Sequence, residues 1–150
     1  MAISRLRTSL QRHRHVALDT SVFIYHVEAN PRYVGITHHI FSWLESHTVS
    51  AVTSTVTLME LLVQPYRDSD EKRINGFLTL LPAFPNLSWV APDIEIASLA
   101  AQIRARHRLQ TPDALQAATA IHGTATLLIT NDPIFERLEN LEVLLLDRFI

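Results

Sequence analysis

The stretch Val16-Ala17-Leu18-Asp19-Thr20-Ser21-Val22-Phe23-Ile24 decides the fold of this chain. A short apolar run that ends in a carboxylate is typical of a strand buried on both faces of a sheet. Residues 16–19 are therefore predicted to form a strand, and a helix is expected to follow, with Thr20 or Ser21 as its N-cap. A strand that passes directly into a helix indicates an α/β fold.

The same alternation of strands and helices continues along the rest of the chain. Apolar runs predict further strands, and helical spacing between them predicts helices, so the sequence indicates a parallel sheet covered by helices on both faces. The predicted strands span 49–52, 87–90, 126–130 and 142–146, and the predicted helices span 33–46, 55–66, 68–81, 92–107, 111–123 and 133–138.

Two of these helices carry specific expectations. In the helix over 92–107, Ile94, Ala97 and Ala101 are expected to face inward, with Leu99 as a further candidate. The stretch Thr111-Pro112-Asp113 is a strong helix start, with a capping Thr, Pro at the first helical position and an acid in the first turn. Asp113 is thereby placed at the N-terminus of its helix.

Length and composition favour one soluble domain. The chain has 150 residues, of which 47% are hydrophobic and 19% charged, enough to bury a core. We predict a single domain over residues 1–150, with a basic N-terminal arm over 1–15 and a core over 16–150. No apolar run reaches the roughly 18 residues of a membrane span.

The cysteine count and the N-terminal sequence indicate a cytoplasmic protein. The chain has no cysteine, which excludes disulfides, thiolate catalysis and Cys-ligated zinc. The arginines of the N-terminal arm are not followed by an apolar stretch, as they would be in a secretory signal.

The basic residues are distributed unevenly, although the net charge is only −2. They gather in the N-terminal arm and in a group formed by Arg104, Arg106, His107 and Arg108. Arginine can bind phosphate in a bidentate way, which suits a nucleic-acid partner. Alternatively, the arm is simply solvated and the second group complements the negative end of a helix.

Four acids stand at the ends of predicted strands or near the starts of predicted helices: Asp19, Glu60, Asp113 and Asp132. Each has an ordinary structural explanation as a cap, a capping-box residue or a first-turn acid. Taken together, the four acids indicate a shared binding site, because the carboxyl ends of parallel strands meet at one crevice, where ligands bind. Carboxylates that meet there need a cation, and oxygen ligands suit Mg²⁺ or Mn²⁺. The pattern therefore predicts a metal-dependent enzyme that acts on a phosphodiester.

Thr20, Thr130 and Asn131 lie beside these acids in the sequence. They are candidates to hold a water molecule or to hydrogen-bond the carboxylates. Ordinary turn and cap chemistry explains each of them equally well.

The order of these motifs resembles the signature of the PIN domain family. The similar blocks are Leu18-Asp19-Thr20-Ser21-Val22-Phe23-Ile24, Thr57-Leu58-Met59-Glu60-Leu61, Thr111-Pro112-Asp113-Ala114-Leu115-Gln116-Ala117-Ala118 and Ile129-Thr130-Asn131-Asp132 with Phe135. They occur in the order of the family and span nearly the whole chain, and they look most like those of VapC-type toxins.

The resemblance implies a three-layer α/β/α fold with a five-stranded parallel sheet. It also implies an endoribonuclease that depends on Mg²⁺ or Mn²⁺, forms a homodimer and is held inactive by an antitoxin. The catalytic and metal-binding acids of the family carry over onto Asp19, Glu60, Asp113 and Asp132, and the Thr or Ser of the fourth block onto Thr130. The chain departs from many relatives in having Ile134 two places after the fourth acid, and in its longer N-terminal arm.

Two alternative functions stay open from the sequence. The chain could be a PIN-type nuclease of RNA processing, or a binding module that keeps the fold without turnover. The presence of all four mutually repelling acids favours an enzyme. With three isolated glycines, the sequence offers neither a P-loop nor a dinucleotide-binding fingerprint.

Overall fold

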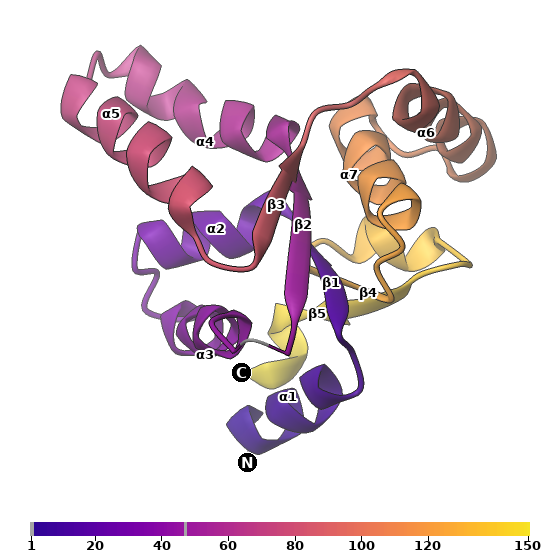
Figure 1. The fold of residues 1–150 in the computed structure, drawn as a ribbon, viewed down its shortest axis with the longest axis horizontal. Coiled ribbons are helices and arrows are strands. Elements are labelled where there is room, and N and C mark those ends of the chain that lie inside the picture. Colours follow the sequence, from indigo (N-terminus) through magenta and orange to yellow (C-terminus); the bar gives the residue numbers. More distant parts are fainter. Residues whose placement is uncertain (1, 47) are drawn as a thin grey trace.

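The computed structural model describes residues 2–46 and 48–150, so Met1 of the predicted arm lies outside the described residues. Five parallel strands form one sheet with the order β3-β2-β1-β4-β5 (Figure 1). The strands are β1 (His15–Leu18), β2 (Ser50–Ser54), β3 (Leu87–Val90), β4 (Leu127–Thr130) and β5 (Glu142–Leu145). The predicted α/β fold with a five-stranded parallel sheet is therefore confirmed.

Helices cover both faces of this sheet. The α-helices are α1 (Ala2–Gln11), α2 (Thr20–Val27), α3 (Val34–Leu44), α4 (Thr55–Arg67), α5 (Glu71–Leu80), α6 (Ile94–His107) and α7 (Thr111–His122). Short 3₁₀ helices are η1 (Leu81–Ala83), η2 (Pro133–Arg137) and η3 (Leu146–Phe149). In Figure 1, α2 and α3 lie on one side of the strands, and α6 and α7 on the other.

The core follows the two-residue period of the central strand. Val16 and Leu18 of β1 pack into the core layer that contains α1, α2 and α3. Ala17, between them, packs into the opposite layer with α6 and α7. Because successive side chains of a strand point to opposite faces, a strand between two helical layers must be apolar at every position. This explains the uninterrupted apolar run in the sequence.

The order of the strands reverses beside β1. The chain moves from β1 to β2 and β3 on one side, and β4 and β5 then add on the other side of β1. Such a reversal is the topological switch point of a doubly wound sheet, and ligands bind outside the carboxyl ends of the strands there. The loops after β1 and β4 are therefore the expected walls of a binding site.

The N-terminal arm is not a loose extension. Residues Ala2–Gln11 form α1, and Leu6 and Leu10 of this helix are fully buried in the core. Arg5 donates a hydrogen bond to the carbonyl oxygen of Arg148 at 3.0 Å, and its guanidinium lies over the ring of Phe149. The arm thus packs against the C-terminal residues of its own chain, which the sequence did not predict.

Two helix expectations from the sequence are wrong in detail. In α6 the buried residues are Ile96, Ala100 and Ile103, whereas Ile94 is 88% exposed. Alanine and isoleucine occur on both sides of this helix, so the apolar stripe was ambiguous. The N-cap of α7 is Gln110 rather than Thr111, and its side chain makes no capping bond.

Within residues 2–46 and 48–150, no helix has both the length and the apolar character needed to cross a membrane.

Candidate active site

The four acids predicted from the sequence line one pocket of about 390 Å³ at the carboxyl ends of the strands. Asp19 follows β1, Glu60 lies in α4, Asp113 in the first turn of α7, and Asp132 after β4. Ser21, Ile24 and Tyr25 of α2 also line this pocket, together with Thr20, Asn131 and Pro133. The site therefore lies at the switch point of the sheet, and α1 lies at the opposite edge, where β1 begins (Figure 1).

Asp19 is the most buried of these acids, with 8% of its surface exposed. It occupies the N-cap position of α2, but its side chain makes no capping bond. Instead, Asp19 Oδ2 accepts a hydrogen bond of 2.7 Å from the hydroxyl of Thr130. Burial raises the pKa of Asp19 to about 6, the charges of Asp113 and Glu60 add to this, and the bonds from Thr130 and from the Thr20 backbone oppose it.

Glu60 lies well inside α4, which excludes the capping-box explanation. The N-cap of this helix is Ser54, whose side chain accepts a bond from the backbone N–H of Val56 at 3.1 Å. Glu60 Oε1 accepts a bond of 2.7 Å from the hydroxyl of Thr20. The residue next to Asp19 thus holds the second carboxylate of the pocket.

Asp113 and Asp132 form the other side of the pocket. Burial raises the pKa of Asp113, and the charges of Asp132 and Glu60 raise it further. Asp132 is exposed and caps η2, because its Oδ1 accepts a bond from the backbone N–H of Ile134 at 2.9 Å. The charges of the four acids act on one another, because Asp113 and Glu60 raise the pKa of Asp19, and Asp132 and Glu60 raise that of Asp113.

Thr130 and Asn131 hold the end of β4 in different ways. Thr130 is fully buried; besides donating to Asp19, its hydroxyl accepts a bond from the backbone N–H of Asp132 at 3.1 Å. The side chain of Asn131 donates to the hydroxyl of Tyr25 and accepts from the backbone N–H of Asp147. Asn131 therefore ties the pocket to the C-terminal residues, and Thr130 contacts an acid directly.

The chemistry of this donor set fits a divalent cation. The pocket offers four carboxylates whose mutual repulsion contributes to the raised pKa values of Asp19 and Asp113. Oxygen ligands of this kind suit Mg²⁺ and Mn²⁺. Among the described residues, no three His, Cys, Asp or Glu side chains already stand in an arrangement that could hold an ion. The four acids that line the pocket are the side chains that would hold such a cation.

A buried polar network beneath the acids escaped the sequence analysis. Its members are Thr53 of β2, Thr57 of α4 and Gln116 of α7, and each is at most 3% exposed. Gln116 donates to the hydroxyls of Thr57 at 2.7 Å and of Thr20 at 3.3 Å. Helical spacing was the available signal, because Gln116 follows Asp113 by three residues and therefore lies on the same side of α7.

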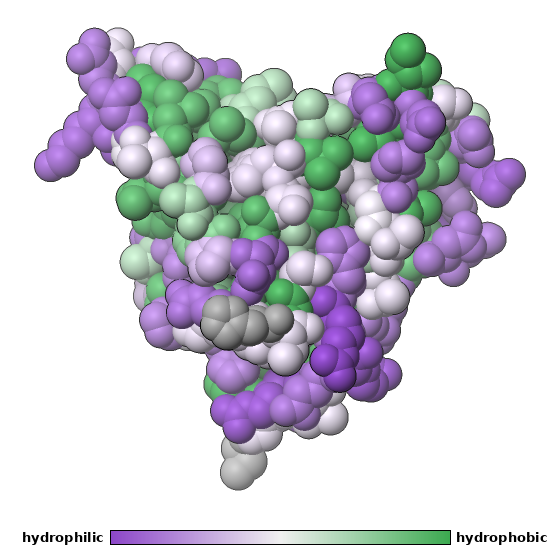
Figure 2. Space-filling view, in the orientation of Figure 1, coloured by the Kyte–Doolittle hydropathy of each residue, from purple (hydrophilic) through white to green (hydrophobic). Residues whose placement is uncertain are grey.

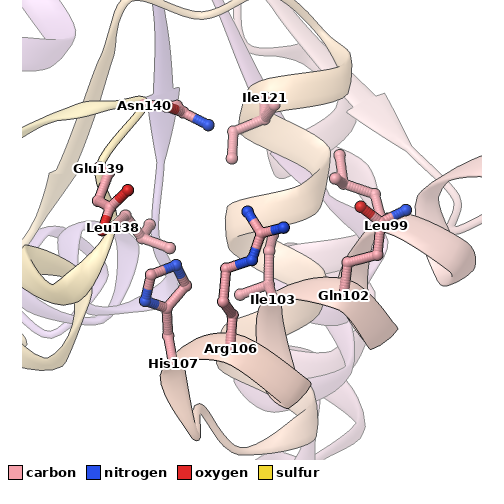
Figure 3. Close-up of a pocket in the computed structure, with 9 residues that line it drawn as sticks. All are labelled: Leu99, Gln102, Ile103, Arg106, His107, Ile121, Leu138, Glu139 and Asn140. Atoms are coloured by element: carbon pink, nitrogen blue, oxygen red, sulfur yellow. The ribbon is translucent and has the colours of Figure 1, made fainter.

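A second pocket, of about 90 Å³, lies between α6, α7 and the residues after η2, away from the acids. Figure 3 shows Arg106 and His107 of α6 projecting into it. The basic group predicted from the sequence lies here, at the C-terminal end of α6, where positive charge complements the helix dipole. Arg104 Nε donates to the carbonyl oxygen of Leu109, and Arg137 Nη1 to that of His107.

Comparison with known protein families shows to which family the chain belongs. The model of the PIN domain matches residues 16–141, which include all four acids of the pocket. The chain belongs to the PIN domain family. Helix α1 precedes the part that matches this family. A comparison with curated proteins gave no match.

Solved structures share the fold at low sequence identity. VapBC2 from Rickettsia felis, bound to a DNA fragment from their promoter, is 18% identical, with a TM-score of 0.70 over 87% of this chain and 97% of that one. VapBC-1 from nontypeable Haemophilus influenzae is 20% identical, with a TM-score of 0.67 over 89% and 98%. FitAcB from Neisseria gonorrhoeae is 20% identical, with a TM-score of 0.65 over 87% and 97%. These similarities extend the PIN fold over most of the chain.

Proposed function

We propose that this protein is an endoribonuclease that depends on Mg²⁺ or Mn²⁺ and acts as the toxin of a toxin–antitoxin pair. The observation that supports this most is that four acids from four separate segments line one pocket of a PIN domain. A binding module has no need to keep a buried carboxylate whose pKa is raised to about 6 by burial and by neighbouring charges. Perturbed carboxylates in a pocket are instead typical of catalytic sites.

Asp19, Glu60, Asp113 and Asp132 are the residues that would hold the metal. A bound divalent ion supplies an activated water molecule and neutralises the charge that develops on the leaving oxygen of the phosphodiester. The hydroxyls of Thr130 and Thr20 fix one oxygen each of Asp19 and Glu60. The protein therefore contributes two carboxylates, Asp19 and Glu60, whose orientations are held by threonine hydroxyls.

The walls of the pocket suit single-stranded RNA. Tyr25 lines the pocket and stacks on Tyr33, with ring centroids 4.0 Å apart and the planes 13° from parallel. Single-stranded RNA is bound largely through unstacked bases that pack on aromatic rings. We infer that Tyr25 is the place where a base next to the cleaved bond would pack.

A toxin of this kind requires an antitoxin, and the surface has a region that suits a protein partner. Met59, Val63 and Tyr66 of α4 and Leu78 and Leu80 of α5 are exposed apolar side chains. Figure 2 shows hydrophobic residues gathered over α4 and α5 on the face in view. Exposed apolar patches mark protein interfaces.

The matched structures support this part of the proposal. The similar structure from Rickettsia felis is that of VapBC2, and another similar structure is a toxin–antitoxin complex from Klebsiella pneumoniae. By analogy, we propose that the chain binds a cognate antitoxin, forms a homodimer and acts in the cytoplasm, where its RNA substrate is found.

Induced expression in a bacterial host tests the toxin function. The parent chain should arrest growth and fragment cellular RNA, and co-expression of its antitoxin should restore growth. Asp113→Asn should abolish both effects at an equal protein level. Equal growth arrest by Asp113→Asn would overturn the proposal, and RNA cleavage without growth arrest would favour a nuclease of RNA processing.

A further inference from the structure

We propose that Gln116 is a positioning residue of the candidate active site, which directs the single hydroxyl proton of Thr20 to Glu60. This inference rests on the proposed metal-dependent function and extends it to a residue whose side-chain amide bonds to threonines rather than to an acid. Gln116 is 3% exposed and lies on α7, one turn after Asp113. Its side-chain amide contacts Thr57 and Thr20, which come from two other helices.

The direction of the hydrogen bonds follows from counting protons. The hydroxyl of Thr53 donates to the carbonyl oxygen of Leu18 at 2.8 Å, and a carbonyl can only accept. The proton of Thr53 is therefore committed. Thr53 and Thr57 are also 2.8 Å apart through their hydroxyl oxygens, so the proton of this bond must come from Thr57. Thr57 consequently has no proton left for any other partner.

Gln116 completes this arrangement, because its amide nitrogen carries two protons. One is donated to Thr57 at 2.7 Å and the other to Thr20 at 3.3 Å. Since both threonine oxygens accept from Gln116, the proton of Thr20 is free to point away from the amide. Its acceptor is Glu60 Oε1 at 2.7 Å, which is closer than Thr57 at 3.3 Å and is a carboxylate.

The opposite orientation of the Gln116 amide breaks the network. If the amide oxygen faced the threonines, Thr20 and Thr57 would both have to donate to it. Thr57 would lose its bond to Thr53, and Thr20 would no longer hold Glu60. Thr20, Thr53, Thr57 and Gln116 are all buried, so water is not at hand to replace the lost bonds.

The network therefore fixes two neighbouring parts of the site at once. Thr53 holds the carbonyl oxygen of Leu18, the residue before Asp19, and Thr20 follows Asp19 directly. Through Thr20, Gln116 holds one oxygen of Glu60 and leaves the other to bind a cation. Partners that orient metal ligands typically change metal affinity by about 10- to 100-fold when they are removed.

Nuclear magnetic resonance tests the orientation of the amide in the metal-free protein. The side-chain amide protons of Gln116, assigned through their loss in Gln116→Met, should show NOEs to the side chains of Thr20 and Thr57. Amide protons that show NOEs only to other residues would mean that the oxygen faces the threonines, and this would overturn the inference.

A double-mutant cycle tests the positioning role with Mn²⁺ alone as the probe. Gln116→Met and Thr20→Val should each weaken Mn²⁺ binding about 10-fold. The double variant should bind no more weakly than Thr20→Val, because Gln116 acts through Thr20. Thr119→Val is the matched control, since Thr119 is a buried residue of the same helix whose hydroxyl donates only to the backbone oxygen of Leu115. Urea unfolding of each variant verifies that it is folded.

The outcomes separate the inference from the proposed function. Suppose that the parent binds Mn²⁺, but that the effects of the two substitutions on Mn²⁺ affinity are additive or that Gln116→Met leaves this affinity unchanged. The positioning role of Gln116 is then wrong, while the metal site stands. If the folded parent binds no Mn²⁺, the metal-dependent function falls, and the positioning role with it. A weakened, non-additive pair with an unaffected Thr119→Val supports the inference.

Discussion

Thr130 donates a hydrogen bond of 2.7 Å to Asp19 Oδ2 across the boundary between two adjacent parallel strands, although 111 positions of the chain separate the residues. The bond favours the ionised form of Asp19, whereas burial favours the neutral form. Burial dominates, because the pKa of Asp19 is raised to about 6. The candidate site thus holds a carboxylate that is poorly solvated and close to other acids.

Removal of the Thr130 hydroxyl should raise the pKa of Asp19 further. Thr130→Val eliminates the donor that stabilises the carboxylate, so the pKa should move above about 6. The NMR titration of the Asp19 carboxyl carbon in metal-free protein measures this shift. Thr130→Ser, which retains a hydroxyl, should titrate like the parent, and a pKa in Thr130→Val at or below the parental value would contradict the assignment.

The raised pKa of Asp19 predicts how stability depends on pH in the metal-free protein. The folded state binds this proton more tightly than the unfolded chain does, so the free energy of unfolding should fall as pH rises from 3.8 to about 6. A pKa shift of this size lowers the free energy of unfolding by at most about 3 kcal/mol over this pH range. Asp113 acts in the same direction, because its pKa is also raised, by burial and by Asp132 and Glu60.

Urea unfolding of the parent and of Asp19→Asn checks this dependence. The free energy of unfolding of Asp19→Asn, relative to that of the parent, should be larger at about pH 7 than at about pH 4. The reason is that Asn cannot ionise. A difference between the two proteins that does not change with pH would show that Asp19 titrates alike in the folded and unfolded chains.

Divalent metal should stabilise the folded protein through the same acids. Mn²⁺ at 100 times its dissociation constant is expected to add about 2.7 kcal/mol to the free energy of unfolding. Asp113→Asn should lose most of this gain, whereas Asp68→Asn, at an exposed acid just beyond α4, should keep it. Equal stabilisation of all three proteins would place the metal elsewhere.

The strands, and the positions of the four acids beside strand ends and helix starts, could be predicted because local sequence patterns determine them. Residues 16–18 form an unbroken apolar run, and Pro112 marks the helix start beside Asp113. That the acids share one pocket followed from the topology of parallel strands. Their metal binding and catalysis stay predictions.

The remaining features depend on tertiary contacts that local patterns do not contain. Gln116 and Thr57 are polar residues on helix faces that pack inward, and their roles appear only when α2, α4 and α7 meet. Leu6 and Leu10 belong to a core cluster that also contains Leu144 and Leu146, at the other end of the sequence. In α6, apolar residues on two sides gave no unique inward face.

Helix α1 should contribute to stability. Leu10→Ala removes a fully buried side chain and should cost about 2–5 kcal/mol of the free energy of unfolding. Arg7→Ala, at an exposed position of the same helix, should change it by no more than about 0.5 kcal/mol. Urea unfolding measures both, and a negligible effect of Leu10→Ala would mean that α1 does not pack on the core in solution.

RNA cleavage by the purified protein tests the central claim most directly. The parent should cut RNA in the presence of Mg²⁺ or Mn²⁺, and the addition of EDTA should stop this cleavage. Asp19→Asn and Asp113→Asn should each lose about 100-fold or more of the rate, and Asp68→Asn should cut like the parent. Cleavage that persists at the parental rate in the Asp19→Asn and Asp113→Asn variants, or that is insensitive to EDTA, would contradict a metal-dependent nuclease site at these carboxylates.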